Sequence, residues 1–293
     1  MSTDKNKSDF PGLDDFLRNA LDEDIGTGDV TTLSCVAENA VSEGSFTAKE
    51  PGVISGLGVV SKIFAMLDES VNITFFVSDG DTVNVGDVIA KISGPSRAVL
   101  TAERTALNLL QHMSGIATKT AETVREVTGT KTRILDTRKT TPGMRALEKY
   151  AVVCGGGINH RYNLATGILI KDNHIKASGG IMNAVQSVRE RISSEGSADS
   201  HNISDMKIEV ETESLSQVEE ALNAGADIIM LDNMSPELMT QAVKYINGRA
   251  LTEASGNMGE RNLKEIAETG VDYISVGALT HSVKALDISL KFQ

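Results

Sequence analysis

Residues 207–233 read KIEVETESLSQVEEALNAGADIIMLDN, and this stretch decides the fold. Two short apolar runs, KIEVE from Lys207 and IIMLDN from Ile228, lie on either side of an amphipathic segment. Such an alternation of strand, helix and strand is typical of a βαβ unit, whose two strands are parallel. The stretch therefore predicts a parallel sheet or an α/β barrel.

Four more strand candidates continue this alternation on both sides of the stretch. They are RILDTRK from Arg133, GILIKDN from Gly167, ALTEASG from Ala250 and YISVGA from Tyr273. We therefore expect six strands, separated by amphipathic helices, in the second half of the chain.

The first part of the chain has a different pattern. Residues 13–21 place apolar side chains at helical spacing, and residues 75–95, FFVSDGDTVNVGDVIAKISGP, alternate apolar and polar side chains between turns. These patterns predict a helix and short antiparallel strands in a small α/β sandwich domain. Residues 100–126 predict one long helix, or two joined near Gly115, leading to the second domain.

Composition excludes several functions. The net charge of −12 argues against a general nucleic-acid surface, and no apolar stretch approaches the roughly 18 residues that a membrane span needs. The N-terminus, MSTDKNKSDF, lacks the hydrophobic core of a secretory signal, so we expect a cytoplasmic protein with a disordered tail over residues 1–9. Cys35 and Cys154 are interpreted as reduced thiols. The polar run over residues 193–205 predicts a solvated loop.

The predicted strands all end in polar or glycine residues. In α/β barrels, catalytic groups lie at the carboxyl ends of the strands, so we expect these side chains to gather around one mouth. Any single one could instead be a solvated charge or part of a strand-end salt bridge. The strand-end residues are Asp136, Arg138, Lys139, Lys171, Asp172, Glu209, Glu211, Asp232, Glu253, Ser255 and Gly277.

Cationic donors are concentrated near this mouth, although the protein is acidic. Arginine forks and lysine ammonium groups bind carboxylates and phosphates, so the substrate should carry several negative charges. A lone histidine is more often structural, but His160 follows a glycine run and precedes an arginine. The donors are Arg138, Lys139, His160, Arg161 and Lys171.

Glu211 and Asp232 follow neighbouring predicted strands and offer the hard oxygen ligands that suit Mg²⁺. The alternative is that they form ion pairs with the same cations. A pyrophosphate-bearing substrate would account for both the cations and the carboxylates.

The loops EASGN at 253–257 and SVGALTHS at 275–282 predict a site for a monophosphate end, since glycine lets backbone N–H groups approach a phosphate. The triplet Gly155–Gly157 matches no P-loop or dinucleotide fingerprint.

Together these motifs resemble the quinolinate phosphoribosyltransferase family over roughly residues 22–292. The resemblance is carried by DIGTGDVTT, AERTALNLLQHMSGIAT, LDTRKTTPGMRALEKYAVVCGGGINHRYNL, ILIKDNHI, IEVE, LDN, EASGN and VGALTHS. It implies an N-terminal α/β sandwich over residues 10–115, joined by residues 282–293, and an open, incomplete α/β barrel over residues 116–281. It also implies decarboxylating phosphoribosyl transfer from phosphoribosyl pyrophosphate to quinolinate in NAD biosynthesis, with Mg²⁺.

The resemblance further implies a homodimer with a shared active site, and higher oligomers stay open. Arg104 would be contributed in trans. Catalysis would involve Lys139, Lys171, Glu211 and Asp232, with the last two also holding the metal. Substrates would be bound by these four and by Thr137, Arg138, His160, Arg161, Ser255, Gly256, Asn257, Val276, Gly277, Ala278 and His281, besides Arg104. Asn257 departs from the family pattern EASGG, and its side chain is expected to crowd the phosphate loop.

Two other functions stay open at this point. One is a related phosphoribosyltransferase or phosphate-binding barrel for another carboxylated heterocycle, such as nicotinate or a molybdenum-linked substrate. The other is a catalytically silent barrel that serves as a binding subunit, which would have no need to keep these charged residues together.

Overall fold

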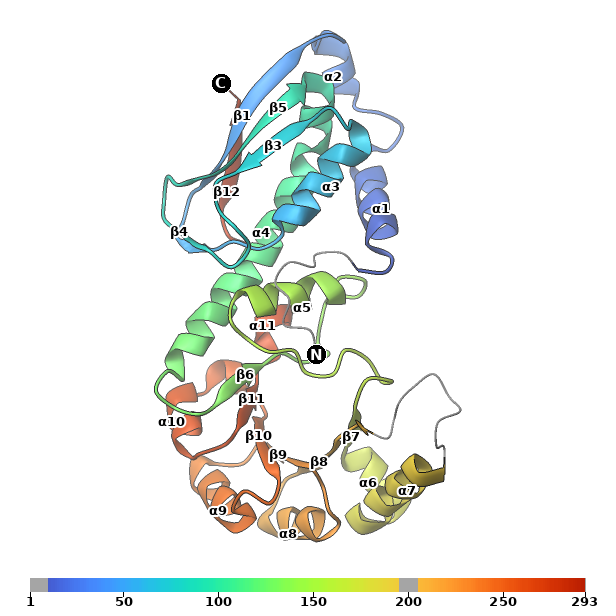
Figure 1. Cartoon of the computed structure of the whole chain (residues 1–293), viewed down its shortest axis with the longest axis vertical. Coiled ribbons are helices and arrows are strands. Elements are labelled where there is room, and N and C mark those ends of the chain that lie inside the picture. Colours follow the sequence, from blue (N-terminus) through green and yellow to red (C-terminus); the bar gives the residue numbers. More distant parts are fainter. Residues whose placement is uncertain (1–9, 195–204, 293) are drawn as a thin grey trace. The chain divides into compact units, whose positions relative to one another are not determined.

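The computed structural model describes residues 10–194 and 205–292, and it divides the chain into two compact units (Figure 1). Unit 1 contains the described residues up to Glu122, together with Thr140–Gly157 and the chain from Leu279 onward. Unit 2 contains Thr123–Lys139 and the described residues of Ile158–Ala278. The predicted border near residue 115 lies inside a helix, and the domain limits stay a prediction.

Unit 1 combines an antiparallel sheet with helices. Its elements are α1 (Leu13–Ile25), α2 (Val30–Cys35), β1 (Val41–Ala48), β2 (Gly52–Val53), α3 (Leu57–Leu67), β3 (Asn72–Phe75), β4 (Thr82–Val83), β5 (Val88–Pro95), α4 (Ser96–Glu126), α5 (Arg145–Cys154) and β12 (Ile288–Phe292). The last residues of α4 belong to unit 2.

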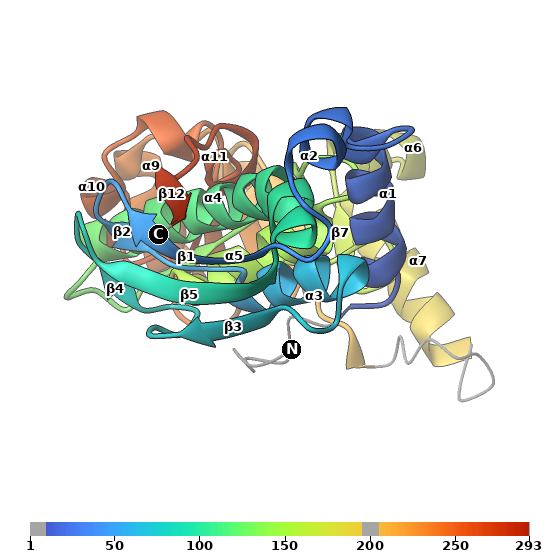
Figure 2. The same ribbon diagram turned by 90° about the horizontal axis from the view of Figure 1, so that it is seen from above.

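The main sheet of unit 1 has the strand order β12-β1-β5-β3, and every pair is antiparallel. Helices α3 and α4 lie against this sheet (Figure 2). The ring of Phe46 on β1 meets that of Phe64 on α3 edge to face, with 6.2 Å between centroids, and both are fully buried. The predicted antiparallel strands and α/β character are therefore confirmed.

Helix α4 is continuous through Gly115, where the sequence left open one helix or two. A Cβ on Gly115 would lie 3.1 Å from the Cα of Ala285, so glycine at this position lets the chain before β12 pass close to the helix. The first predicted helix is also confirmed as α1, which buries Leu13, Leu17 and Leu21.

Unit 2 alternates strands and helices as predicted. Its elements are β6 (Arg133–Leu135), β7 (Ile168–Ile170), α6 (Asp172–Ser178), α7 (Ile181–Ser194), β8 (Ile208–Thr212), α8 (Leu215–Asn223), β9 (Ile228–Asp232), α9 (Pro236–Ile246), β10 (Leu251–Ser255), a 3₁₀ turn (Met258–Glu260), α10 (Leu263–Glu268) and β11 (Tyr273–Ser275), with α11 (Ala278–His281) at the border of the units.

The six strands form one parallel sheet in the order β6-β11-β10-β9-β8-β7. The sheet is curved, and α7 to α10 follow its outer side (Figure 1). The edge strands β6 and β7 do not pair with each other, so the barrel is open. Ile158 forms an isolated parallel bridge with Leu135 and brings the following residues onto the sheet beside β6. The predicted incomplete barrel is confirmed.

Short caps define where the helices of unit 2 begin. The Ser214 side chain accepts a hydrogen bond from the backbone N–H of Gln217 at the start of α8, and Ser235 does the same for Leu238 in α9. Strands β7 and β9 are almost continuously apolar, because helices cover the outer face and side chains fill the inner one, whereas β8 and β10 also contain polar residues. Inward-facing polar residues near the strand ends are therefore exceptions that need partners.

Among the helices of the described ranges, none combines the length and apolar character that a bilayer crossing requires. Cys35 is exposed, Cys154 is buried, and both are free thiols. Most of the predicted loop over residues 193–205, and the predicted tail over residues 1–9, lie outside the described residues.

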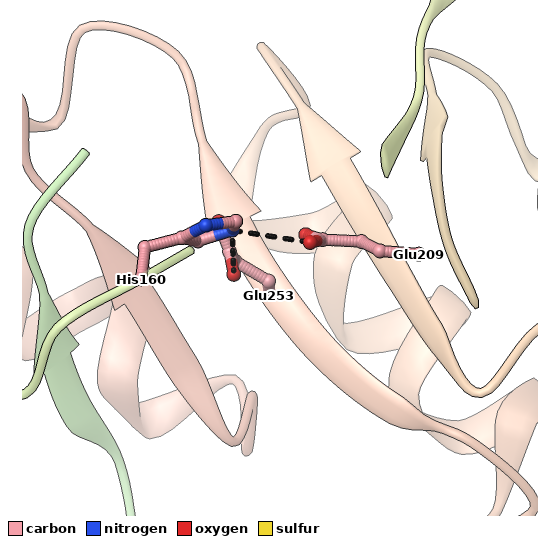
Figure 3. A group of neighbouring side chains, drawn as sticks. All are labelled: His160, Glu209 and Glu253. Atoms are coloured by element: carbon pink, nitrogen blue, oxygen red, sulfur yellow. Dashed lines mark ion pairs between the residues drawn. The ribbon is translucent and has the colours of Figure 1, made fainter. Parts of the chain in front are cut away.

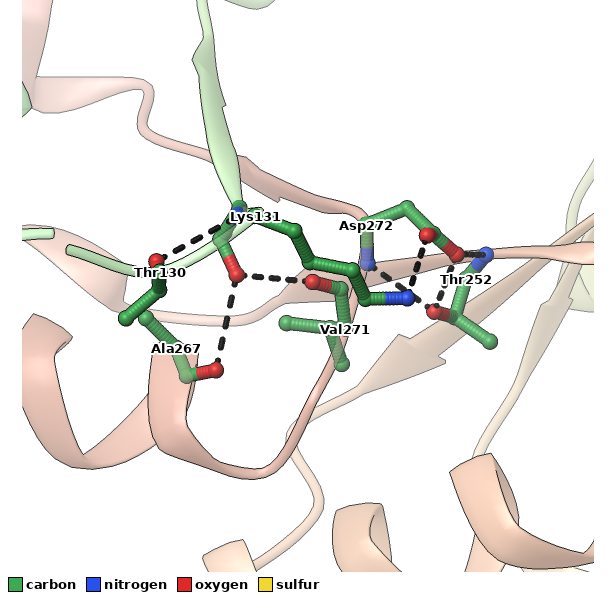
Figure 4. A network of polar contacts seen from close by, with 7 residues as sticks. Thr130, Lys131, Thr252, Ala267, Val271 and Asp272 are labelled. Carbon is green, nitrogen blue, oxygen red and sulfur yellow. Dashed lines mark hydrogen bonds and ion pairs between the residues drawn. The ribbon is translucent and has the colours of Figure 1, made fainter. Parts of the chain in front are cut away.

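Asp272 ties three strands together at the amino-terminal end of the sheet (Figure 4). Its side chain accepts hydrogen bonds from Thr252 N–H at 2.9 Å, from Thr252 Oγ1 at 2.8 Å and from Lys131 Nζ at 2.7 Å. Burial alone would raise the pKa of Asp272, but the hydrogen bonds from Lys131 and Thr252 hold it below its ordinary value. Residues at the amino-terminal ends of barrel strands generally contribute to stability rather than to catalysis.

Asp272→Asn should therefore lower the free energy of unfolding at neutral pH by about 1–2 kcal/mol, because the charged acceptor of three donors is lost. A carboxyl group with a depressed pKa stabilises the fold above its unfolded pKa, and this contribution disappears as the pH falls through the folded pKa. The difference between wild type and variant should thus shrink in acid. Urea unfolding at several pH values measures both effects, and equal midpoints at pH 7 would contradict the assignment.

Candidate active site

A cavity of about 550 Å³ opens at the carboxyl ends of the strands of unit 2. Most of the side chains that the sequence predicted for the site meet there. Those that line it are Thr137, Arg138, Lys139, His160, Arg161, Lys171, Glu211, Asp232, Ser255, Gly256 and Asn257.

Other predicted residues lie elsewhere. Val276, Gly277 and Ala278 follow β11 and are not among the lining residues. Arg104 on α4 and His281 on α11 belong to unit 1, and both are exposed. The part of the site formed by unit 2 therefore lacks these two side chains.

The cavity also contains residues that the sequence did not predict to contact a substrate or metal. Glu253 was visible as a strand-end carboxylate, and Asn233 stood in the LDN motif, but neither signal indicated contact with a ligand. Leu169 and Met230 gave no signal beyond that of a buried strand. The added lining residues are Leu169, Met230, Asn233, Glu253 and Ser275.

Neighbouring charges affect the cationic side chains in the cavity. Burial lowers the pKa of Arg161, and the neighbouring Arg138 guanidinium lowers it further, while Glu209 opposes this change. Arg161 Nη1 donates to the carbonyl of Gly167 at 3.0 Å, and a Cβ on Gly167 would lie 3.0 Å from that of Arg161. Two neighbouring guanidinium groups favour a ligand with more than one negative charge.

Glu211 and Asp232 lie on the adjacent strands β8 and β9. Lys171 Nζ lies 2.7 Å from Glu211 Oε2, so the ion pair considered as the alternative to metal binding exists for Glu211. Asp232 Oδ2 accepts from Asn233 Nδ2 at 2.7 Å. Within the described part of the chain, Glu211 Oε1 and Asp232 Oδ1 accept no hydrogen bond. Two carboxylates with one spare oxygen each fit Mg²⁺, which usually completes its shell with substrate phosphates and water.

His160 lies against two buried carboxyl groups (Figure 3). Its Nε2 is 3.1 Å from Glu209 Oε2 and 3.6 Å from Glu253 Oε2, and both glutamates are almost completely buried. Their remaining oxygens accept no hydrogen bond from the described residues. Burial raises the pKa of both carboxyl groups, and Glu209 raises that of Glu253 further.

The same three residues place their ligand atoms within 4.8 Å of one another, which is close enough for a metal ion. The histidine ring argues against one. Nδ1 of His160 accepts the backbone N–H of Arg161 at 2.7 Å, so a neutral ring carries its proton on Nε2. A protonated Nε2 cannot be a metal ligand, and here it faces the two carboxyl groups. The geometry therefore favours a cluster of side chains over a metal site.

The loops after β9 and β10 contact each other and line part of the cavity. Asn233 N–H donates to the carbonyl of Ser255 at 3.0 Å, and a Cβ on Gly256 would lie 2.6 Å from Asn233 Cγ. Gly256 has φ +96°, and Asn257 has φ +51°. Asparagine is one of the few side chains that tolerate this left-handed conformation, so Asn257 is compatible with a backbone shape that otherwise favours glycine.

Comparison with known proteins places this chain in a family. The sequence profile of the quinolinate phosphoribosyl transferase C-terminal domain matches residues 116–291, and the profile of the N-terminal domain of the same family matches residues 29–114. The two profiles together span most of the chain.

Individual relatives agree with the profiles. A probable nicotinate-nucleotide pyrophosphorylase [carboxylating] of Bacillus subtilis is 46% identical over 278 residues, which are 95% of this chain and 92% of the relative. A tobacco quinolinate phosphoribosyltransferase [decarboxylating] is 42% identical over 295 residues, with 95% and 82% covered. The solved structure of the nicotinate-nucleotide pyrophosphorylase from Francisella tularensis has a TM-score of 0.92 at 39% identity and covers 100% of both chains. This chain belongs to the quinolinate phosphoribosyltransferase family.

Proposed function

We propose that this enzyme transfers the phosphoribosyl group of phosphoribosyl pyrophosphate to quinolinate with loss of CO₂. The products are nicotinate mononucleotide and pyrophosphate, in NAD biosynthesis. The observation that carries the proposal is the single cavity in which Arg138, Arg161 and Lys171 lie together with the carboxylates of Glu211 and Asp232. Two dissimilar anions, a pyridine dicarboxylate and a phosphorylated sugar, need such a mixed site.

The arginines would hold the dicarboxylate. Burial and the Arg138 guanidinium disfavour the charge of Arg161 in the partly buried cavity, and a bound dianion would relieve this cost. Thr137 accepts a hydrogen bond from the backbone N–H of Lys139 at 3.0 Å and so shapes the loop that presents Arg138 and Lys139. The family resemblance adds Arg104 and His160 to this subsite.

Transfer of the ribosyl group requires departure of pyrophosphate. The bond between C1′ and the pyrophosphate oxygen breaks, C1′ gains oxocarbenium character, and the pyridine nitrogen forms the new bond to it. Lys139 and Lys171 would stabilise the charge that develops on the leaving oxygens, as fixed cations do most effectively inside a protein. Mg²⁺ held by Glu211 and Asp232 would neutralise charge on the pyrophosphate.

Loss of CO₂ follows from the first step. Alkylation of the nitrogen makes the ring a pyridinium, which accepts the electron pair left at C2 when the bond to its carboxylate breaks. The C2 carbanion then takes up a proton. The cations must bind the dicarboxylate without stabilising the departing carboxylate as strongly as the transition state, because only the difference lowers the barrier.

The 5′-phosphate would lie on the glycine loops. The family resemblance assigns it to Ser255, Gly256, Asn257, Val276, Gly277 and Ala278, with His281 nearby. Asn257 is expected to change the grip of this loop, since its side chain replaces a hydrogen. The cytoplasmic location expected from the sequence stays a prediction.

Turnover by the purified enzyme tests the proposal directly. With phosphoribosyl pyrophosphate and Mg²⁺ present, quinolinate should be consumed with stoichiometric release of CO₂ and pyrophosphate, and omission of Mg²⁺ should abolish the reaction. Turnover of nicotinate but not of quinolinate would contradict the assignment and favour the related transferase. Absence of turnover with either substrate would favour a binding subunit.

Gly256→Ala should raise the KM for phosphoribosyl pyrophosphate and lower kcat/KM by about a hundredfold, because the new Cβ overlaps Asn233 and separates the two loops. Gly248→Ala is the matched control: φ is +74° at that glycine, but no atom lies within 4 Å of its Cβ position. Both variants carry the backbone strain of about 1–2 kcal/mol. Equal kinetic losses in steady-state assays would show that strain, rather than loop separation, is responsible.

We also propose a homodimer in which Arg104 completes the partner's site, as the family resemblance implies. Arg104→Ala and Lys171→Ala should each be nearly inactive. After the two proteins are mixed and allowed to exchange subunits, about a quarter of wild-type activity should return, because half of the dimers are mixed and each has one intact site of two. Activity that stays at the level of the separate variants would place Arg104 in its own subunit's site.

A further inference from the structure

His160 has both of its ring nitrogens occupied within the protein. Nδ1 accepts the backbone N–H of Arg161 at 2.7 Å, and Nε2 faces Glu209 at 3.1 Å and Glu253 at 3.6 Å. A histidine that contacts a substrate carboxylate needs one N–H directed at it. In this arrangement the single N–H of the neutral ring points at the two glutamates.

Three buried acids, two on strands and one just beyond a strand, contact this residue. The backbone N–H of His160 donates to Asp136 Oδ1 at 2.7 Å, just beyond β6, while Glu209 lies on β8 and Glu253 on β10. All three acids have exposed fractions of 4% or less. Placing three carboxyl groups in a barrel interior costs stability unless each has a partner. Apolar side chains would avoid this cost, so we interpret the cluster as functional.

The His160 ring in turn accepts a hydrogen bond from Arg161. The backbone of this residue is bound by His160 Nδ1, and its guanidinium is bound by the carbonyl of Gly167. Burial and the nearby Arg138 guanidinium both lower the pKa of Arg161, so electrostatic repulsion favours displacement of its side chain. Two fixed contacts, one at each end of the residue, oppose that displacement.

We propose that His160 is a positioning residue, which the Glu209–Glu253 pair holds by its Nε2 and which fixes Arg161 through its Nδ1 for recognition of the substrate dicarboxylate. The proposal rests on the proposed function and assigns His160 a different role from the direct substrate contact that the family resemblance implies. It also gives Glu253, which the sequence left without a role in the site, a place in substrate recognition.

Two substitutions at position 160 distinguish the roles of the ring nitrogens. Asparagine places its amide oxygen close to the position of Nδ1, so His160→Asn should still accept the Arg161 N–H. Glutamine places its amide close to the position of Nε2, so His160→Gln should reach the glutamates but release Arg161. We expect the KM for quinolinate to rise by about tenfold or more in H160Q and by only about threefold in H160N. The KM for phosphoribosyl pyrophosphate should change by less than about twofold in both.

The opposite order, with H160Q closer to wild type than H160N, would overturn the proposal and favour direct contact through Nε2. Equal changes in the two variants, or no change in either, would also overturn it. Turnover of quinolinate by the wild-type enzyme is measured first, so that failure of the proposed function is recognised separately.

A double-mutant cycle tests the contribution of Glu253. Glu253→Gln should raise the KM for quinolinate in the wild-type background and have no further effect in the H160N background, where the ring that contacts Glu253 is missing. The same change in both backgrounds, or none in the wild type, would overturn a role that acts through His160.

Asp272→Asn is the control for general loosening of the barrel, since this acid ties strands together at the other end of the same sheet. It should lower the melting temperature without changing either KM. If the KM for quinolinate rises in D272N as it does in E253Q, the effect of Glu253 is structural and the proposal fails.

Discussion

Parallel pairing of the six strands is the constraint on which the rest of unit 2 depends. Because every strand runs in the same direction, all their carboxyl ends meet at one edge, and residues more than a hundred positions apart in the sequence come into contact. Glu209 and Glu253 lie within β8 and β10, and the curved parallel sheet brings them to His160, whose backbone N–H is bound by Asp136 just beyond β6. The open edge between β6 and β7 leaves room for residue 158 to pair with β6 and for His160 to follow it inward.

Carboxyl groups offset part of the charge of the cations in the cavity. Cations that must recognise a dianion have to be kept close together before it arrives, although they repel one another. Glu211 offsets the charge of Lys171, and Glu209 opposes the fall in the pKa of Arg161. The cavity thus combines several cations with carboxyl groups that offset part of their charge, in a protein whose net charge is −12.

Backbone conformation also shapes the cavity, at the loops that follow β9 and β10. Asn233 and Asn257 both adopt positive φ, and Gly256, which has no Cβ, packs against the side chain and backbone of Asn233. These features let the loops after two neighbouring strands approach closely. The carboxylate of Asp232 is oriented from within this loop pair, since Asn233 donates to it. Asn233 therefore links the proposed metal ligand Asp232 to the loop that would bind phosphate.

Much of this protein can be predicted from its sequence. Periodicity alone indicated the six parallel strands, the first helix and the antiparallel sheet, because alternation of apolar and polar residues reports directly which faces are buried. Polar residues at the strand ends indicated where the cavity would lie, since parallel strands end together. Family resemblance, carried by motifs such as DTRKTTPG and NHRYNL, indicated the reaction, and the profiles and relatives agree with it.

The partners within the cavity were decided only by the tertiary structure. The sequence could not tell that Lys171 pairs with Glu211, that Nε2 of His160 points at Glu209 and Glu253, or that Gly256 packs on Asn233. Each of these contacts depends on strand register and on the curvature of the sheet, which differ by a few ångströms between arrangements with the same periodicity. A sequence pattern determines which face a side chain takes, whereas three-dimensional packing determines which atom it meets there.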